Sequence, residues 1–188
     1  MKTKMVAEPW ATSAAGRAGL DLEIGRLAGD AEARVCAEMM SSSDPWVFFG
    51  RTFEQCLARV TNPGGEVWVA REDGIARGFI ILVLQGAFVG YIQVVCVAAD
   101  ARGSGLGSRL VRFAEERVFR EFPNVFLCVS SINPRARQLY ERLGYTLVGE
   151  LDDYLVRGHS EFLMRKSAGP LAEFRPESER SPTPEEQS

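Results

Sequence analysis

The sequence has few of the residues on which several kinds of site depend. Its four cysteines form no Cys-x-x-Cys pair, and His159 is its single histidine. Because cysteine-based zinc sites usually need paired spacing, we expect no metal site. A serine or cysteine hydrolase is also disfavoured, since the chain has no Gly-x-Ser-x-Gly turn and only one imidazole for a catalytic triad.

The chain also lacks an excess of basic charge and a long apolar run. It has 22 Lys and Arg residues against 25 Asp and Glu residues, a formal net charge of −3. Proteins that bind mainly to a phosphate backbone have a strong basic excess, so no nucleic-acid partner is expected. The longest apolar stretch, residues 78–91, contains Gln85 and is shorter than the roughly 18 residues that a membrane helix needs, so no membrane association is expected.

Composition divides the chain into three parts. Residues 1–20 are rich in alanine and glycine, contain no continuous apolar segment typical of an export signal, and are expected to form a flexible arm. A folded domain is expected over residues 21–166, followed by a disordered tail over residues 167–188 that is acidic and rich in proline. Without an export signal we expect a cytoplasmic protein whose cysteines remain reduced.

Hydrophobic periodicity predicts an α/β (α+β) domain. Alternating apolar residues predict antiparallel strands in the first half of the domain, and a helix between two strands in the second half predicts one β-α-β crossover. Asp30 is the expected N-cap of the first helix. The expected helices span residues 30–40, 51–60, 106–118 and 136–143, and the expected strands span residues 20–24, 67–70, 76–84, 88–98, 125–129, 145–148 and 161–164.

The most informative segment is a glycine-rich turn between an apolar strand and an amphipathic helix. Glycines at positions 103, 105 and 107 keep side chains away from the start of that helix, where free backbone N–H groups attract anions. A pyrophosphate group would fit such a turn, although a turn that merely packs the helix on the strand is the alternative. Two other phosphate motifs do not match, because the chain has no Gly-Lys-Ser/Thr triplet and the glycine spacing is not GxGxxG.

Two motifs, in this order, resemble the GCN5-related N-acetyltransferase (GNAT) superfamily. Arg102, Gly105 and Gly107 match its Arg/Gln-x-x-Gly-x-Gly/Ala signature. Residues 133–145 are similar to its Asn-x-x-Ala-x-x-Leu-Tyr-x-x-Leu-Gly-Phe/Tyr segment. The resemblance implies a mixed, mostly antiparallel sheet of about six to seven strands flanked by helices.

The resemblance also implies that acetyl-CoA donates an acetyl group to a primary amine of a small molecule, peptide or protein, by direct attack on the thioester. It implies that Tyr140 is the catalytic general acid and that Asn133 lies near the thioester; the alternatives are a core aromatic and a helix N-cap. Arg135 or Arg137 is a further candidate for the 3′-phosphate. The implied cofactor contacts on the pantetheine arm are Val95, Cys96 and Val97. The backbone N–H groups of Gly103, Ser104, Gly105, Leu106, Gly107 and Ser108 are implied to bind the pyrophosphate, and the other implied contacts are Arg102, Asn133 and Tyr140.

The sequence specifies the acceptor site less closely than the donor site. Cys128 stands where amino-terminal acetyltransferases of this superfamily often have a glutamate base, so the base stays open. Residues 43–49 are a candidate acceptor wall. A non-catalytic acyl-CoA-binding sensor or interaction module is the alternative function, and a homodimer is compatible with either. The candidates for the base are Glu150, Asp152, Asp153, His159, Glu161 and water.

Overall fold

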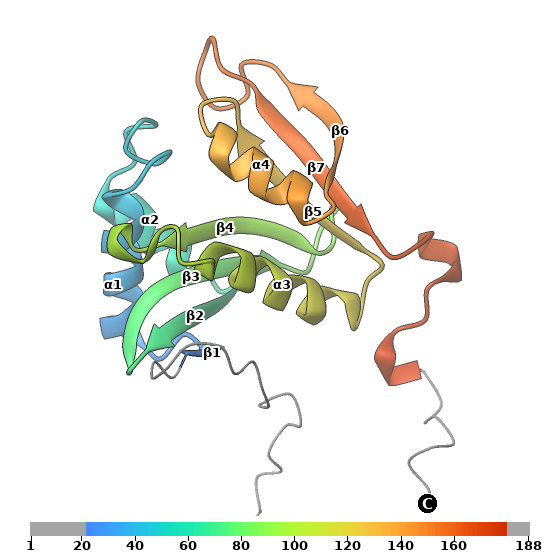
Figure 1. The fold of residues 1–188 in the computed structure, drawn as a ribbon, viewed down its shortest axis with the longest axis horizontal. Helices are drawn as coiled ribbons and strands as arrows, with labels where there is room; N and C mark the ends of the chain where they lie inside the picture. Colours follow the sequence, from blue (N-terminus) through green and yellow to red (C-terminus); the bar gives the residue numbers. More distant parts are fainter. Residues whose placement is uncertain (1–21, 180–188) are drawn as a thin grey trace, which may run out of the picture.

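The computed structural model describes residues 22–179, which contain one sheet of seven strands in the order β1-β2-β3-β4-β5-β7-β6 (Figure 1). Neighbouring strands are antiparallel except β4 and β5, which are parallel. This confirms the mixed, mostly antiparallel sheet. The strands are Leu22–Arg26 (β1), Glu66–Glu72 (β2), Ile75–Val83 (β3), Tyr91–Val97 (β4), Asn124–Ser130 (β5), Thr146–Leu151 (β6) and Glu161–Ser167 (β7).

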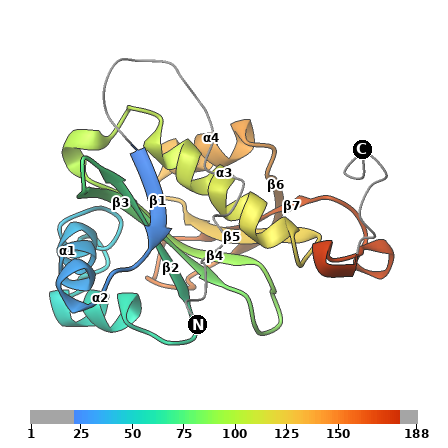
Figure 2. The ribbon, with the colours of Figure 1, turned by 90° about the horizontal axis from the view of Figure 1, so that it is seen from below.

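Helices cover both faces of the sheet (Figure 2). Alternation along β3 shows the two layers, since Phe79 and Ile81 pack with α1 and α2 whereas Ile80 and Leu82 pack with α3 and α4. The central strand therefore has apolar side chains on both faces, as expected for a buried strand. The helices are Asp30–Ser41 (α1), Phe53–Val60 (α2), Leu106–Phe119 (α3) and Pro134–Arg142 (α4).

The helix starts follow local capping rules, with one correction. Thr52 caps α2 in a capping box with Gln55. Asp30, the expected N-cap of α1, lies instead in its first turn, and the N-cap is Gly29 at φ 84. No side chain caps Gly29; Glu32 accepts a hydrogen bond from the Ala28 amide at 2.7 Å and so holds this end of the helix.

One difference from the expected strands has a clear cause. The strand expected from residue 88 begins at Tyr91, because the preceding segment contains Gly86 at φ 100 and Gly90 at φ 82, which an extended ladder does not accommodate. In addition, β7 pairs with both β5 and β6 and so lies between them. Periodicity alone could not give this order. The β4-α3-β5 crossover is confirmed.

The sheet opens between β4 and β5, and this opening positions the site. The two strands pair only at Tyr91 with Phe126 and at Ile92 with Leu127. β4 then continues to Val97 without pairing to β5, and the two strands diverge in Figure 1. The β5-facing edge of residues 93–97 therefore has backbone N–H and C=O groups outside the ladder.

A close approach of α3 to the sheet depends on Gly78 of β3. A Cβ atom there would lie 2.9 Å from the Cys96 carbonyl oxygen and 3.2 Å from Leu110 Cδ1. We expect Gly78→Ala to lower the free energy of unfolding by about 1–3 kcal/mol, measured by chemical denaturation, because the sheet and α3 must separate. Gly149→Ala on β6 is the control, since nothing lies within 4 Å of its Cβ position. Equal stability of the two variants would contradict this role of Gly78.

The segment after the sheet is placed against the end of α3. β7 runs to Ser167, one residue past the expected domain boundary, and the Ala168 amide donates to the Pro123 carbonyl at 2.8 Å. The Glu177 amide donates to the Arg120 carbonyl at 2.7 Å. These main-chain contacts give residues 168–179 a defined course that composition does not reveal. The rest of the predicted tail, residues 180–188, and the predicted arm lie outside the described residues.

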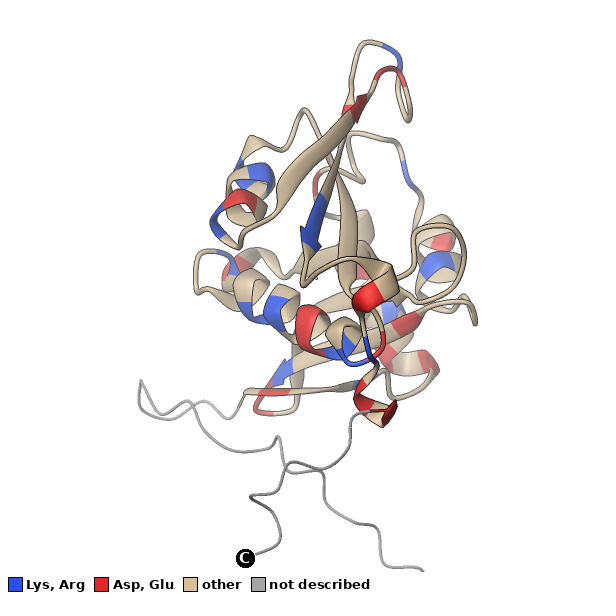
Figure 3. Cartoon of the chain, turned by 90° about the vertical axis from the view of Figure 1, so that its right-hand side faces the viewer, with Lys and Arg blue, Asp and Glu red and all other residues tan. Residues whose placement is uncertain are grey.

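In the described part of the chain, charged residues are spread over the helices and do not form one large patch of a single sign. Basic and acidic residues alternate along the helices (Figure 3). Among residues 22–179, no helix is both long and apolar enough to cross a membrane.

Three of the four cysteines are buried. Cys36, Cys56 and Cys96 lie between the sheet and the helices α1 and α2, whereas Cys128 is only half-buried. Burial raises the pKa of Cys36 and Cys96 to about 12.

Candidate functional site

Two adjoining cavities lie where β4 and β5 diverge. The first, of about 440 Å³, is bounded by the glycine-rich turn, the end of β4 and α4. The second, of about 1040 Å³, extends along β4 and β5 toward α2 and the loop between β6 and β7. The two cavities adjoin and are together called the cleft. Seven residues line both of them: Asp44, Pro45, Trp46, Val95, Asn133, Ala136 and Tyr140.

The glycine-rich turn leaves the start of α3 uncovered. Gly103 and Gly105 adopt φ values of 85 and 90, which favour glycine, and no side chain caps the helix at Gly105. Nothing lies within 4 Å of a Cβ atom built on Gly105. Within residues 22–179, the amides of Gly107 and Ser108 have no hydrogen-bond partner. The turn can therefore present free N–H donors to an anion in the first cavity.

Most of the residues selected from the sequence line this first cavity, but two do not. The Ser104 hydroxyl donates to the Ala101 carbonyl at 2.8 Å, and the Leu106 side chain is buried in the core at 2% exposure. The contacts expected for these two residues are made by backbone N–H groups, which the side-chain positions leave as a prediction. The selected residues that line the cavity are Val95, Cys96, Val97, Arg102, Gly103, Gly105, Gly107, Ser108, Asn133 and Tyr140.

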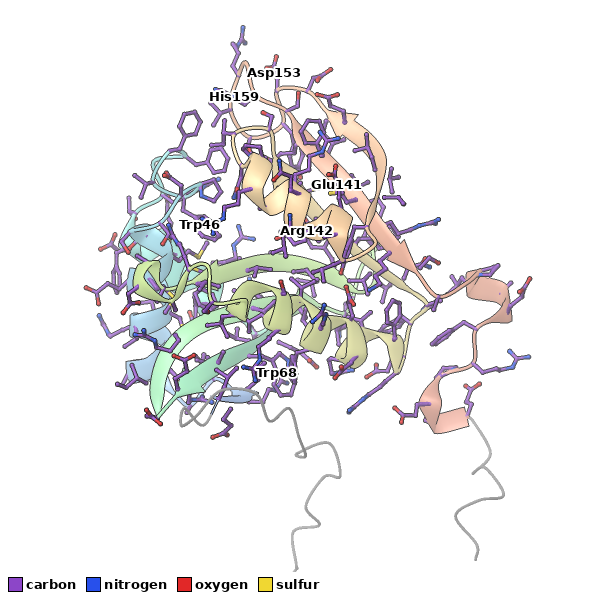
Figure 4. The ribbon with its side chains drawn as sticks, viewed as in Figure 1. Trp46, Trp68, Glu141, Arg142, Asp153 and His159 are labelled. Carbon is purple, nitrogen blue, oxygen red and sulfur yellow. The ribbon has the colours of Figure 1, made fainter. Side chains whose placement is uncertain are left out.

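Arg102 connects the turn to the loop between α1 and α2. Its Nη2 donates to Ser43 Oγ at 2.7 Å, and its Nε donates to the Val97 carbonyl at 3.3 Å. Ser43 is buried and donates in turn to the Met39 carbonyl at 2.7 Å. The loop fixed in this way carries Trp46, which Figure 4 shows reaching toward the space beneath α4.

Asn133 and Tyr140 combine structural positions with access to the cleft. Asn133 caps α4, since its Oδ1 accepts from the Ala136 amide at 3.1 Å, and this leaves its NH₂ group as a donor. The Tyr140 ring packs edge-on against Tyr145 at 5.8 Å. Burial raises the pKa of Tyr140 to about 12, so its phenol is protonated at neutral pH and can donate a proton.

Two arginines of α4 line the first cavity. Arg135 does so near Gly103, where its Nη2 lies 3.8 Å from the Cβ position. Arg137 does not, because its Nε is bonded to Glu141 at 3.0 Å and its guanidinium lies over the Phe162 ring. Arg142 also lines the cavity and was missed (Figure 4). The available signal was its spacing of seven residues from Arg135, which places both on one helix face.

Three acidic candidates for the base face solvent. Glu150, Asp152 and Asp153 are exposed, and none of them lines either cavity. Asp152 accepts from the Ser160 hydroxyl at 2.9 Å, and Asp153 accepts from the Gly158 amide. Asp152 and Asp153 therefore stabilise the loop between β6 and β7, and Figure 4 shows Asp153 at its outer end.

The other two protein candidates, His159 and Glu161, differ in their access to the cleft. His159 packs edge-on against Phe48 at 5.0 Å, so it joins the loop after β6 to the loop after α1. Glu161 lines the second cavity and is 6% exposed. Its Cα pairs with Ser130 across β5 and β7. Burial raises the pKa of Glu161, and the adjacent Ser130 hydroxyl offsets part of that rise.

The second cavity contains the expected acceptor wall and several residues that were missed. Asp44, Pro45, Trp46 and Phe49 from the predicted wall line it. Polar and aromatic groups from α2 and β4 were not predicted, although the polar Gln93 within an otherwise apolar strand segment was a usable signal in the sequence. These missed residues are Gln55, Arg59, Tyr91 and Gln93.

The family model described as the acetyltransferase (GNAT) family matches residues 33–145, more than half of the sequence. The chain belongs to the acetyltransferase (GNAT) family. A relative, the blasticidin-S acetyltransferase of Streptomyces morookaense, is 38% identical over 78 residues. The alignment covers 38% of this chain and 57% of that protein, so the chain spans little more than half of this relative's length.

Solved structures of GNAT proteins share the fold. A GNAT-family protein from Desulfovibrio desulfuricans has a TM-score of 0.68 at 19% identity, over 79% of this chain and 100% of that chain. An aminoglycoside 6′-N-acetyltransferase complexed with coenzyme A has a TM-score of 0.64 at 18% identity, over 79% of this chain and 98% of that chain. At these identities the likeness concerns the fold alone.

Proposed function

We propose that this chain transfers an acetyl group from acetyl-CoA to a primary amine. One observation carries the proposal: the first cavity combines free helix N-terminal amides with the unpaired edge of β4, and Tyr140 lines it as well as the second cavity. A donor held in the first cavity would thus meet an acceptor held in the second. Family membership supports the same reaction class.

The proposed donor site has two parts. The amides at the start of α3 would bind the pyrophosphate, with Arg135 and Arg142 adding positive charge beside it. The unpaired edge of β4 would bind the amides of the pantetheine arm, as an added strand does at a sheet edge. The turn residues Arg102, Gly103, Ser104, Gly105, Leu106, Gly107 and Ser108 and the β4 residues Val95, Cys96 and Val97 make up this proposed site.

The proposed reaction is direct attack of the acceptor nitrogen on the thioester carbon. Asn133 borders both cavities and would hydrogen-bond the donor near the thioester through its NH₂ group. Tyr140 would give its phenolic proton to the departing thiolate. Its burial keeps the phenol protonated, since the pKa of Tyr140 is raised to about 12.

A small-molecule amine is the acceptor class that the available likeness favours. The relative from Streptomyces morookaense is named for acetylation of blasticidin S, and the second cavity, at about 1040 Å³, is large enough for a ligand of drug size.

We also propose a compartment and an oligomeric state. The free thiols fit a reducing cytoplasm. Exposed Leu147 and Val148 on the edge strand β6 favour a homodimer, which light scattering would test.

A panel of amines tests the proposed function. Release of coenzyme A thiol would be measured with blasticidin S, free amino acids, polyamines, aminoglycosides and peptides with a free amino terminus. We expect saturable turnover with at least one small-molecule amine and a mass increase of one acetyl group in the product. Binding of acetyl-CoA without turnover of any amine would instead identify a non-catalytic acyl-CoA-binding module.

A further inference from the structure

One buried carboxylate in the second cavity has no role in the donor site. Glu161 is the first residue of β7, is 6% exposed and lines that cavity. None of the ion pairs within residues 22–179 includes Glu161. An ionised carboxylate is costly to bury without a cation, so such groups are concentrated at functional sites.

The groups around Glu161 are mostly neutral at pH 7. Ser130 lies opposite it on β5, and Cys128 lies diagonally across the same pair of strands. The pKa of Cys128 is raised by burial, as is that of Tyr91 on β4, so both keep their protons. Tyr154 of the loop after β6 also lines the cavity. The other charged groups lining it are Asp44, Arg51 and Arg59, all exposed residues of α2 or of the loop before it.

We propose that Glu161 is the general base that accepts a proton from the acceptor's ammonium group. The proposal rests on the proposed function. Within the described residues, Glu161 is the only buried carboxylate lining either cavity. Tyr140, the proposed acid, lines the same cavity from α4, so the base and the acid border one space from two different elements.

The proton balance assigns one transfer to each group. The ammonium gives a proton to the Glu161 carboxylate, and the free lone pair forms the C–N bond. The C–S bond then breaks, and the thiolate takes the Tyr140 proton. The second proton lost by nitrogen returns to Tyr140 through water, and Glu161 releases its proton to solvent. The products are one N-substituted acetamide, one thiol and one released proton.

The surroundings of Glu161 favour its action as a base. Burial raises the pKa of its carboxyl group toward that of an amine, which reduces the free-energy cost of the proton transfer. The carboxylate form also attracts a cationic acceptor into the cavity. Glu150, on the neighbouring strand β6, is exposed and lines neither cavity. It therefore supplies a matched control for loss of one carboxylate.

The first test compares acceptors of different basicity. Glu161→Gln and the control Glu150→Gln would be assayed with the alkylamine turned over fastest in the panel and with benzohydrazide, whose nitrogen is unprotonated at pH 7. We expect Glu161→Gln to lower kcat about a hundredfold or more for the alkylamine and less than about tenfold for the hydrazide. Calorimetry should give unchanged acetyl-CoA affinity for both variants, and thermal melting should show that both fold.

The pH profile supplies the second readout. In the unmodified protein, kcat/KM should level off above the pKa of Glu161. In Glu161→Gln it should instead rise about tenfold per pH unit between pH 6 and 8, following the free-amine fraction. An unchanged rate and profile in a folded Glu161→Gln variant would overturn the base assignment while leaving the proposed function intact. Failure of the unmodified protein to turn over any amine would overturn the proposed function, and the base assignment with it.

Discussion

Replacement of Gly105 by aspartate is expected to weaken acetyl-CoA binding about a hundredfold. The Cβ position of Gly105 has nothing within 4 Å, and the residue lines the first cavity, so a new carboxylate would face the proposed pyrophosphate. Two like charges about 5 Å apart repel by about 3 kcal/mol at an effective dielectric constant near 20, which corresponds to roughly two decades in affinity. Isothermal titration calorimetry with acetyl-CoA measures the effect.

Gly105→Asn separates this charge effect from backbone strain. Both variants place a side chain of similar size at φ 90, a conformation that asparagine and aspartate tolerate better than most residues. We expect Gly105→Asn to bind acetyl-CoA at least about tenfold more tightly than Gly105→Asp, and the difference to shrink at high salt. Equal affinities of the two variants would show that the turn does not bind the pyrophosphate.

Tyr140→Phe is expected to lower kcat about a hundred- to ten-thousandfold, the usual contribution of a general acid. Phenylalanine keeps the ring contact with Tyr145, so the α4 packing and the affinity for acetyl-CoA should change little. Because the pKa of Tyr140 is about 12, its phenol stays protonated at lower pH. The activity of the unmodified protein should therefore not fall through ionisation of Tyr140 until the pH approaches that value.

Tyr145→Phe is the matched control for loss of a phenol. Tyr145 is buried next to Tyr140 but lines neither cavity, so its hydroxyl has no access to the donor. We expect kcat of Tyr145→Phe to stay within about twofold of the unmodified protein, whereas kcat of Tyr140→Phe falls. A similar loss in both variants would show that the hydroxyl groups act on the stability of α4 rather than on the leaving thiolate.

Local rules explain why much of the site could be predicted. The glycines of the turn, the Asn133 cap and the strand-to-helix change each depend on a few adjacent residues. These residues define where α3 and α4 begin and therefore where free amides and the Asn133 side chain lie.

Pairing between distant segments could not be predicted in the same way. The position of β7 between β5 and β6 places Glu161 beside Ser130, and nothing in the local sequence of either strand encodes that choice. Of the five charged or titratable candidates for the base, this pairing buries only Glu161 within the cleft. Arg102 is a second example, since its bond to Ser43 joins segments 59 residues apart.

The sequence by itself determined the order and type of the elements, the glycine-rich turn before α3 and the Asn133-to-Tyr145 segment, because capping, glycine conformation and hydrophobic period act over a few residues. Only the tertiary structure decided that β4 leaves β5 after two pairs, that two cavities meet at Tyr140, and that Glu161 is buried in one of them. These features depend on strand register and packing across the whole sheet.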